Sequence, residues 1–194
     1  MLYETNEWYT FIKQTKLIGG YSMTDRKRKC ITVILMVVLG TCMHFVIELL
    51  PAGPIAVFLG NIFPVNETSW EHMKMIWYPF LTAGIILAFQ EKDKGYFAAF
   101  VVCAVMAMLM QLGAFSTYQS FTGISVLILD IIIYFVTMTF CIILAFDFAK
   151  REWAQKAFPL WVILALIITS IIIYLTYYPG GGYVFLDNEG FMGN

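Results

Sequence analysis

The chain has 194 residues, of which 60% are hydrophobic and only 13% charged, and its mean hydropathy is +0.77. Ordinary soluble domains carry about 25% charged residues, so this composition excludes a soluble class and predicts a membrane protein. The net charge of −1 gives no reason to expect a nucleic-acid partner. The four cysteines show no CxxC spacing, which argues against a disulfide framework or a cysteine zinc site.

The amino-terminal segment, residues 1–30, contains no apolar stretch of the kind found in a cleavable signal peptide. Residues 3–18 mix aromatic and charged side chains, a pattern that fits either an interfacial amphipathic helix or a plain tail. The basic stretch "DRKRK" at 25–29 follows, and it is most simply an anchor on the cytoplasmic side.

Five apolar runs are long enough to span a membrane, since a spanning helix needs about 20 mostly apolar residues. We expect transmembrane helices over 31–50, 70–89, 96–116, 124–146 and 157–177. No internal repeat or soluble domain interrupts them. The sequence therefore predicts an all-α membrane protein, with a five-helix transmembrane bundle over 31–178, preceded by segment 1–30 and followed by an outer tail over 179–194.

The orientation follows from the distribution of lysine and arginine among the short loops. The stretches at 25–29, 91–94 and 150–156 are basic and fall on one side if the helices alternate. The opposite side receives 51–69, 117–123 and the tail, which contain no lysine or arginine. We therefore expect a cytoplasmic amino end and an outer carboxyl end.

The loop before the second helix has two parts. Residues 51–66 are apolar, bounded by prolines and too short to span, so we expect a re-entrant or interfacial segment. The following "VNETSWEHMK" is polar. Thr68 and Glu71 have the spacing of a capping box, and Asn66 is an alternative cap as well as a glycosylation sequon.

Each expected helix brings a polar group to one layer in the outer half of the bundle. His44 lies about 10 Å below the outer surface, at 1.5 Å rise per residue, and Glu48 shares its helical face. His72 lies roughly 5 Å below the start of its helix, and Asp130 about 9 Å below the start of its own. Since unpaired ionisable groups are costly in hydrocarbon, we expect these four side chains to line one cavity open to the outside.

Two histidines with carboxylates match the ligand chemistry of a divalent metal such as zinc. In this interpretation His44, His72 and Asp130 are metal ligands, and Glu48 or Glu71 is the general base. The candidate substrate-binding residues are Asn66, Glu67, Trp70, Lys74 and Gln111. A polar network that only fixes helix register, or a pathway for ions, protons or solutes, remains open as an alternative.

The stretch 39–80 resembles a family of small, uncharacterised bacterial membrane proteins. The shared signature is H-x-x-x-E on a helix, then a short apolar loop and P-V-N-E-[ST]-x-W-E-H-x-K. The matching residues are His44, Glu48, Pro64, Val65, Asn66, Glu67, Thr68, Trp70, Glu71, His72 and Lys74. The resemblance covers about a fifth of the chain. It implies a multi-pass protein of the bacterial cytoplasmic membrane and brings no activity.

A weaker similarity, of chemistry only, is to the ceramidase-like zinc hydrolases of membranes. Those enzymes have seven helices and three histidines, whereas five helices are expected here and the chain has two histidines.

Three hypotheses about function follow from these observations. The first is a metal-dependent hydrolase or transferase acting on a lipid or lipid-linked substrate from the outer leaflet, with membrane lipids as partners. The second is a small transporter or binding component that takes a cation or small polar ligand into the same cavity. The third is a non-catalytic structural or immunity-type subunit, in which the polar layer only stabilises the bundle.

Overall fold

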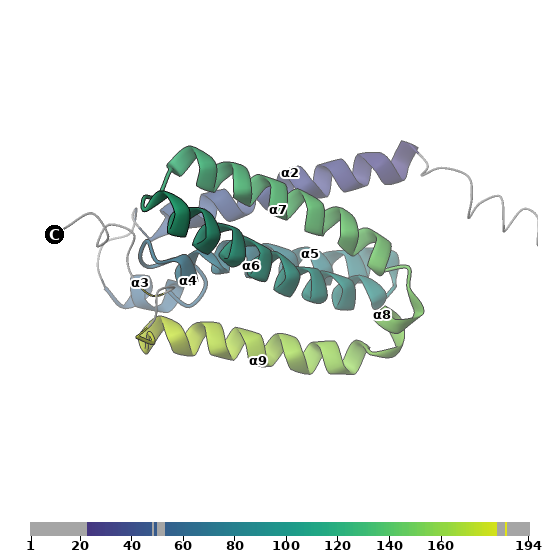
Figure 1. Cartoon of the computed structure of the whole chain (residues 1–194). Helices are drawn as coiled ribbons and strands as arrows, with labels where there is room; N and C mark the ends of the chain where they lie inside the picture. The colour runs from purple at the N-terminus through teal and green to yellow at the C-terminus, as the bar shows by residue number, and fades with distance from the viewer. Residues whose placement is uncertain (1–22, 48, 50–52, 182–184, 186–194) are drawn as a thin grey trace, which may run out of the picture.

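The computed structural model describes residues 23–47, 49, 53–181 and 185. Within these residues all regular secondary structure is helical, without a strand. Five segments are long and apolar enough to cross a membrane, which confirms the predicted helical class and the number of candidate spans. They are α2 (Met23–Val46), α4 (Ser69–His72) continuing into α5 (Lys74–Glu91), α6 (Gly95–Thr122), α7 (Leu127–Phe148) and α9 (Phe158–Tyr177) (Figure 1).

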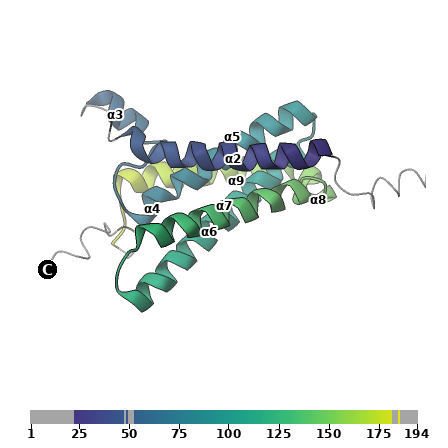
Figure 2. The same cartoon turned by 90° about the horizontal axis from the view of Figure 1, so that it is seen from above.

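Two short helices lie outside this set, namely α3 (Pro54–Leu59) and α8 (Glu152–Lys156). Figure 2 shows α3 at one end of the bundle, beside the carboxyl end of α2. Its residues Ile55, Val57 and Phe58 are exposed. An apolar surface of this kind suits contact with lipid or with the membrane interface.

The ends of α6 and α7 that face each other differ from the expected helix ends. α6 ends at Thr122 instead of Ser116, and Gly123 closes it with a positive φ of 72°. α7 begins at Leu127 instead of Ile124. Asp130 therefore lies in the first turn of α7, about 4.5 Å from its start and not 9 Å.

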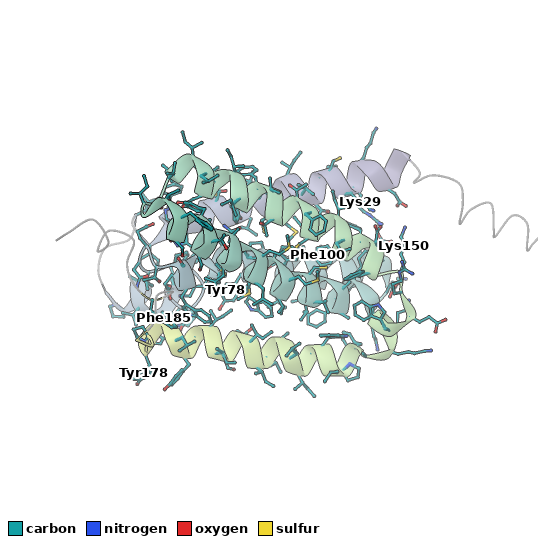
Figure 3. The ribbon with its side chains drawn as sticks, viewed as in Figure 1. Lys29, Tyr78, Phe100, Lys150, Tyr178 and Phe185 are labelled. Atoms are coloured by element: carbon teal, nitrogen blue, oxygen red, sulfur yellow. The ribbon has the colours of Figure 1, made fainter. Side chains whose placement is uncertain are left out.

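The centre of the bundle consists of α5, α6 and α7. α2 packs against α5 and α7, and α9 packs against α6. Trp77, Phe80, Phe100 and Phe146 are among the largest fully buried side chains. Figure 3 shows Phe100 between the two ends of the bundle. By contrast, α9 buries only Ala165 and Ile172 among its described positions, so most of its apolar surface is available to lipid.

α2, α5 and α7 meet closely at the backbone carbonyl of Met75. Pro79 has no N–H to donate to this carbonyl four residues earlier. The Tyr134 hydroxyl of α7 donates to it instead, at 3.4 Å. From α2, Gly40 approaches so closely that an added Cβ would lie 2.6 Å from the same oxygen. Gly40 therefore fixes the position of α2 one turn before His44.

The basic segments lie together at one end of the bundle. Lys29 Nζ of α2 is 3.1 Å from Asp147 Oδ1 of α7, and Arg28 forms an ion pair with Glu91 at the end of α5. Figure 3 shows Lys29 and Lys150 at this end and Tyr178 and Phe185 at the other. We call these the basic end and the α3 end.

Candidate metal centre

The candidate site lies at the α3 end, and three chain segments contribute to it. His44 comes from the last turn of α2, Glu67 from the loop before α4, and His72 from the last residue of α4. The loop must be held firmly over the bundle for Glu67 to reach both histidines.

A buried ion pair anchors this loop. Lys74 and Glu71 have side chains that are 0% and 3% exposed, and Lys74 Nζ lies 2.5 Å from Glu71 Oε2. Lys74 also donates to the carbonyl oxygen of Gly60 at 2.6 Å and to that of Phe63 at 3.4 Å. Buried charges are stable only when they are paired and hydrogen-bonded. Glu71 supplies the opposite charge for Lys74, and the two loop carbonyls accept its remaining hydrogen bonds.

Glu71 connects the loop to the last spanning helix. Its carboxylate accepts from the Val65 backbone N–H at 3.1 Å and from the Thr176 hydroxyl of α9 at 3.0 Å. The Tyr78 hydroxyl donates to the Asn61 carbonyl at 2.6 Å, which adds a third attachment. The loop is thereby tied to both α5 and α9.

The predicted cap is present at the start of α4. The Thr68 side chain accepts from the backbone N–H of Glu71 at 3.3 Å. Asn66 Oδ1 accepts from the Thr68 backbone N–H at 3.1 Å and from its hydroxyl at 2.7 Å. Only half of the capping box forms, because the Glu71 carboxylate turns to Val65 and Lys74. Glu67 lies just before the cap, where its side chain can turn toward α2.

The ligand atoms of His44, Glu67 and His72 all lie within 4.8 Å of one another. Nε2 of His44 is 3.6 Å from one oxygen of Glu67, and Nε2 of His72 is 3.6 Å from the other. The two imidazole rings are 5.2 Å apart between centroids and tilted by 33°. Two ligands at 2.0–2.1 Å from a tetrahedral ion are about 3.3 Å apart, so the observed spacing is close to that of a metal centre.

The hydrogen bond of His72 indicates which of its ring nitrogens is available. Nδ1 lies 2.8 Å from the carbonyl oxygen of Thr68, which can only accept, so Nδ1 carries the proton. In the neutral ring Nε2 then has a lone pair, and this lone pair faces the Glu67 carboxylate, another acceptor. A metal ion between the two groups would satisfy both of them. A histidine whose other nitrogen donates to a carbonyl is the usual arrangement for a metal ligand.

The site is accessible from outside the protein. The side chains of His44, His72 and Glu67 are 23%, 22% and 39% exposed. Structural zinc sites are closed by four protein ligands, whereas catalytic sites keep three and leave one position open. Three ligands with partial exposure fit the catalytic arrangement.

The structure does not bring Asp130 to this group. Its carboxylate accepts from the Ser125 hydroxyl at 2.7 Å and from the Tyr118 hydroxyl, at the turn between α6 and α7. Asp130 lies in the first turn of α7, where the helix dipole stabilises an acidic residue. Glu67, which we expected to contact substrate, is instead the third residue of the group that could hold a metal ion.

The remaining predicted residues are distributed as follows. Gln111 is buried in α6, and its Oε1 has no partner among the described residues. Trp70 packs against Phe185 at 5.6 Å between centroids, and within the described part of the chain its Nε1 is buried without a partner. Glu48 lies outside the described residues. Its predicted role as a general base stays a prediction.

The model of a family of unknown function, DUF6512, matches residues 21–191. The chain belongs to this family. The DUF6512 match includes all five long helices, so it extends well beyond the 39–80 stretch and agrees with the expected membership of an uncharacterised family. The bacterial origin and the specific signature stay predictions. No curated protein and no solved structure matches the chain.

Proposed function

We propose that this protein is a membrane-embedded, metal-dependent hydrolase or transferase that acts on a lipid or lipid-linked substrate. The observation that supports the proposal is the convergence of two imidazoles and one carboxylate within 4.8 Å, on side chains that remain partly exposed. Two histidines and one glutamate form a ligand set that zinc hydrolases use. When bound, zinc supplies Lewis acidity and activates water at its open position.

The residues around this centre would hold it in place. Thr68 orients the ring of His72 through its carbonyl. Glu71 and Lys74 hold the loop that carries Glu67. We therefore assign Glu71 a positioning role, since its carboxylate is engaged by Lys74, Val65 and Thr176 and is 3% exposed. Glu48 is left as the candidate base.

The location of the site favours a substrate from the membrane. We propose that the basic end faces the cytoplasm of a bacterial cell, in agreement with the positive-inside rule, and that the α3 end faces outward. α3 is about 9 Å long and exposes Ile55, Val57 and Phe58, so we place it in the outer interface and not across the membrane. A lipid in the outer leaflet would then have its headgroup at the level of the histidines.

Turnover of membrane lipids tests the proposal. The protein would be reconstituted into vesicles of a bacterial total lipid extract, with and without Zn²⁺, and the lipids followed over time by mass spectrometry. We expect a zinc-dependent product with the wild type and with Asp130→Asn, and none with His44→Ala or His72→Ala. A product that persists in both histidine variants, or an unchanged lipid extract with zinc-loaded protein, would contradict the proposal.

A further inference from the structure

A second candidate site lies far from the histidines, at the basic end. A groove of about 460 Å³ runs between α2 and α5. Its walls are mostly apolar, and they include Ile31, Leu35 and Leu39 from α2 and Ile86 from α5. These four side chains are between 43% and 63% exposed, so the groove opens sideways, toward the lipid in a membrane.

Two basic residues, Lys27 and Arg28, line one end of the groove. Lys27 is exposed and forms no ion pair with another described residue. Arg28 is different, because its terminal nitrogens contact Asp25, Glu91 and Tyr96. Its Nε, however, is buried without a partner within the described part of the chain. The Lys27 ammonium is thus available to an anion, whereas the Arg28 Nε is enclosed by the protein and does not reach the surface of the groove.

The dimensions of the groove fit a lipid tail. From Lys27 to Leu39 the lining residues extend over about 18 Å of α2, at 1.5 Å per residue. Half of a hydrocarbon core about 30 Å thick is about 15 Å, so the groove reaches through one leaflet. It therefore combines a cationic mouth at the headgroup level with an apolar channel of one acyl chain's length.

We infer that this groove binds one anionic phospholipid of the leaflet at the amino-terminal end of α2. The phosphate contacts the Lys27 ammonium, and one acyl chain lies between α2 and α5. A charge-assisted hydrogen bond to phosphate is stronger than a neutral one, and a basic residue near the surface favours anionic lipid. The inference is independent of the proposed metal centre, because no residue is shared.

Photo-crosslinking in the full-length chain tests it. Thr82 lines the groove on α5 and is exposed, so Thr82→p-benzoylphenylalanine places a photoreactive group inside it. Ile86 provides a second position should that variant fold poorly. The control position is Ile167, an exposed apolar residue of α9. Each variant is reconstituted into vesicles containing equal amounts of phosphatidylglycerol and phosphatidylcholine.

We expect the groove position to form phosphatidylglycerol adducts in excess over phosphatidylcholine by roughly fivefold, the discrimination that one basic residue provides near a membrane surface. The excess should be lost with Lys27→Gln, restored by Lys27→Arg and unaffected by Lys156→Gln, which changes an exposed lysine of α8 outside the groove. Ile167 should show no preference.

Three results would overturn the inference. They are equal lipid ratios at Thr82 and Ile167, a phosphatidylglycerol excess that does not depend on Lys27, and a crosslink from the groove to a peptide of the chain's own residues 1–22. The last result would assign the groove to that segment.

Discussion

Glu71 and Lys74 lie within one helical turn of His72, yet their surroundings differ sharply from those of the histidine. Both are buried: Lys74 is bonded to the loop, and Glu71 is bonded to the loop and to α9. His72 is instead partly exposed and faces Glu67. At the residue scale the polar cluster thus divides into a buried anchor and an open ligand group. Composition alone cannot separate the two, because both contain carboxylates and nitrogen bases.

Removing one member of the anchor should destabilise the protein strongly. Lys74→Met leaves the Glu71 carboxylate buried without a counterion, a change that typically costs about 3–5 kcal/mol. The free energy of unfolding in detergent, measured by chemical denaturation, checks this expectation.

The double variant provides the control for the anchor. Glu71→Gln with Lys74→Met removes both charges, so it should be less destabilised than the sum of the two single variants. Strictly additive losses would contradict the claim that these two residues stabilise the loop as a pair.

At the element scale, α2, α5 and α7 meet at the Met75 carbonyl of α5. Tyr134 of α7 donates a hydrogen bond to this carbonyl, and Gly40 of α2 packs closely against it. Tyr134→Phe removes the only hydroxyl that the described residues offer to this oxygen, and should lower the free energy of unfolding by about 1 kcal/mol. Pro79→Ala restores an N–H at the position that normally serves this carbonyl. The effect of Tyr134→Phe should therefore be smaller in a Pro79→Ala background. An equal effect in both backgrounds would show that the carbonyl does not couple the helices.

The close approach of α2 leads to a second prediction at this scale. Gly40→Ala places a methyl group 2.6 Å from the Met75 carbonyl and should cost about 1–3 kcal/mol, as overpacking commonly does. Because His44 lies one turn further along α2, zinc affinity should fall together with thermal stability.

Gly113→Ala in α6 is the matched control, since nothing lies within 4 Å of its added Cβ. It should leave zinc affinity unchanged and stabilise the protein slightly, because alanine is the better helix former. An effect of Gly40→Ala no larger than that of Gly113→Ala would contradict the packing argument.

At the scale of the whole molecule, the two ends of the bundle differ in charge and in chemistry. The basic stretches gather at one end and the candidate metal centre lies at the other. We expect a cysteine introduced at Thr122 to react with a membrane-impermeant maleimide in intact cells. A cysteine at Lys92 should react only after permeabilisation, with native Cys30 and Cys42 replaced by serine in both variants. The reverse pattern would contradict the proposed orientation.

The five candidate spans could be predicted from the sequence because apolar length is a direct signal for them. The nearness of the two histidines was expected from their similar depth together with the cost of an unpaired ionisable group in hydrocarbon. Glu67, the third member of the group, could not be predicted in this way, because depth gives no information about the direction in which a side chain points around its helix. Asp130 was placed too deep because residues 124–126 form part of a turn. Glu67 could have been recognised from its place before the Thr68 cap, where a side chain is free to turn back.

The buried anchor was missed for a related reason. The spacing of Glu71 and Lys74 allows an ion pair on one helical face, but the sequence does not indicate that the loop carbonyls of Gly60 and Phe63 close over it. That contact depends on how the loop folds over the bundle.

The metal content of the purified protein tests the central claim most directly. After equilibration with Zn²⁺ and removal of excess, we expect about one zinc ion per chain for the wild type and for Asp130→Asn. The zinc should be lost, or held at least about tenfold more weakly against a chelator, in His44→Ala, His72→Ala and Glu67→Gln. Zinc that survives all three changes would contradict the account, and so would zinc that depends on Asp130 but not on Glu67.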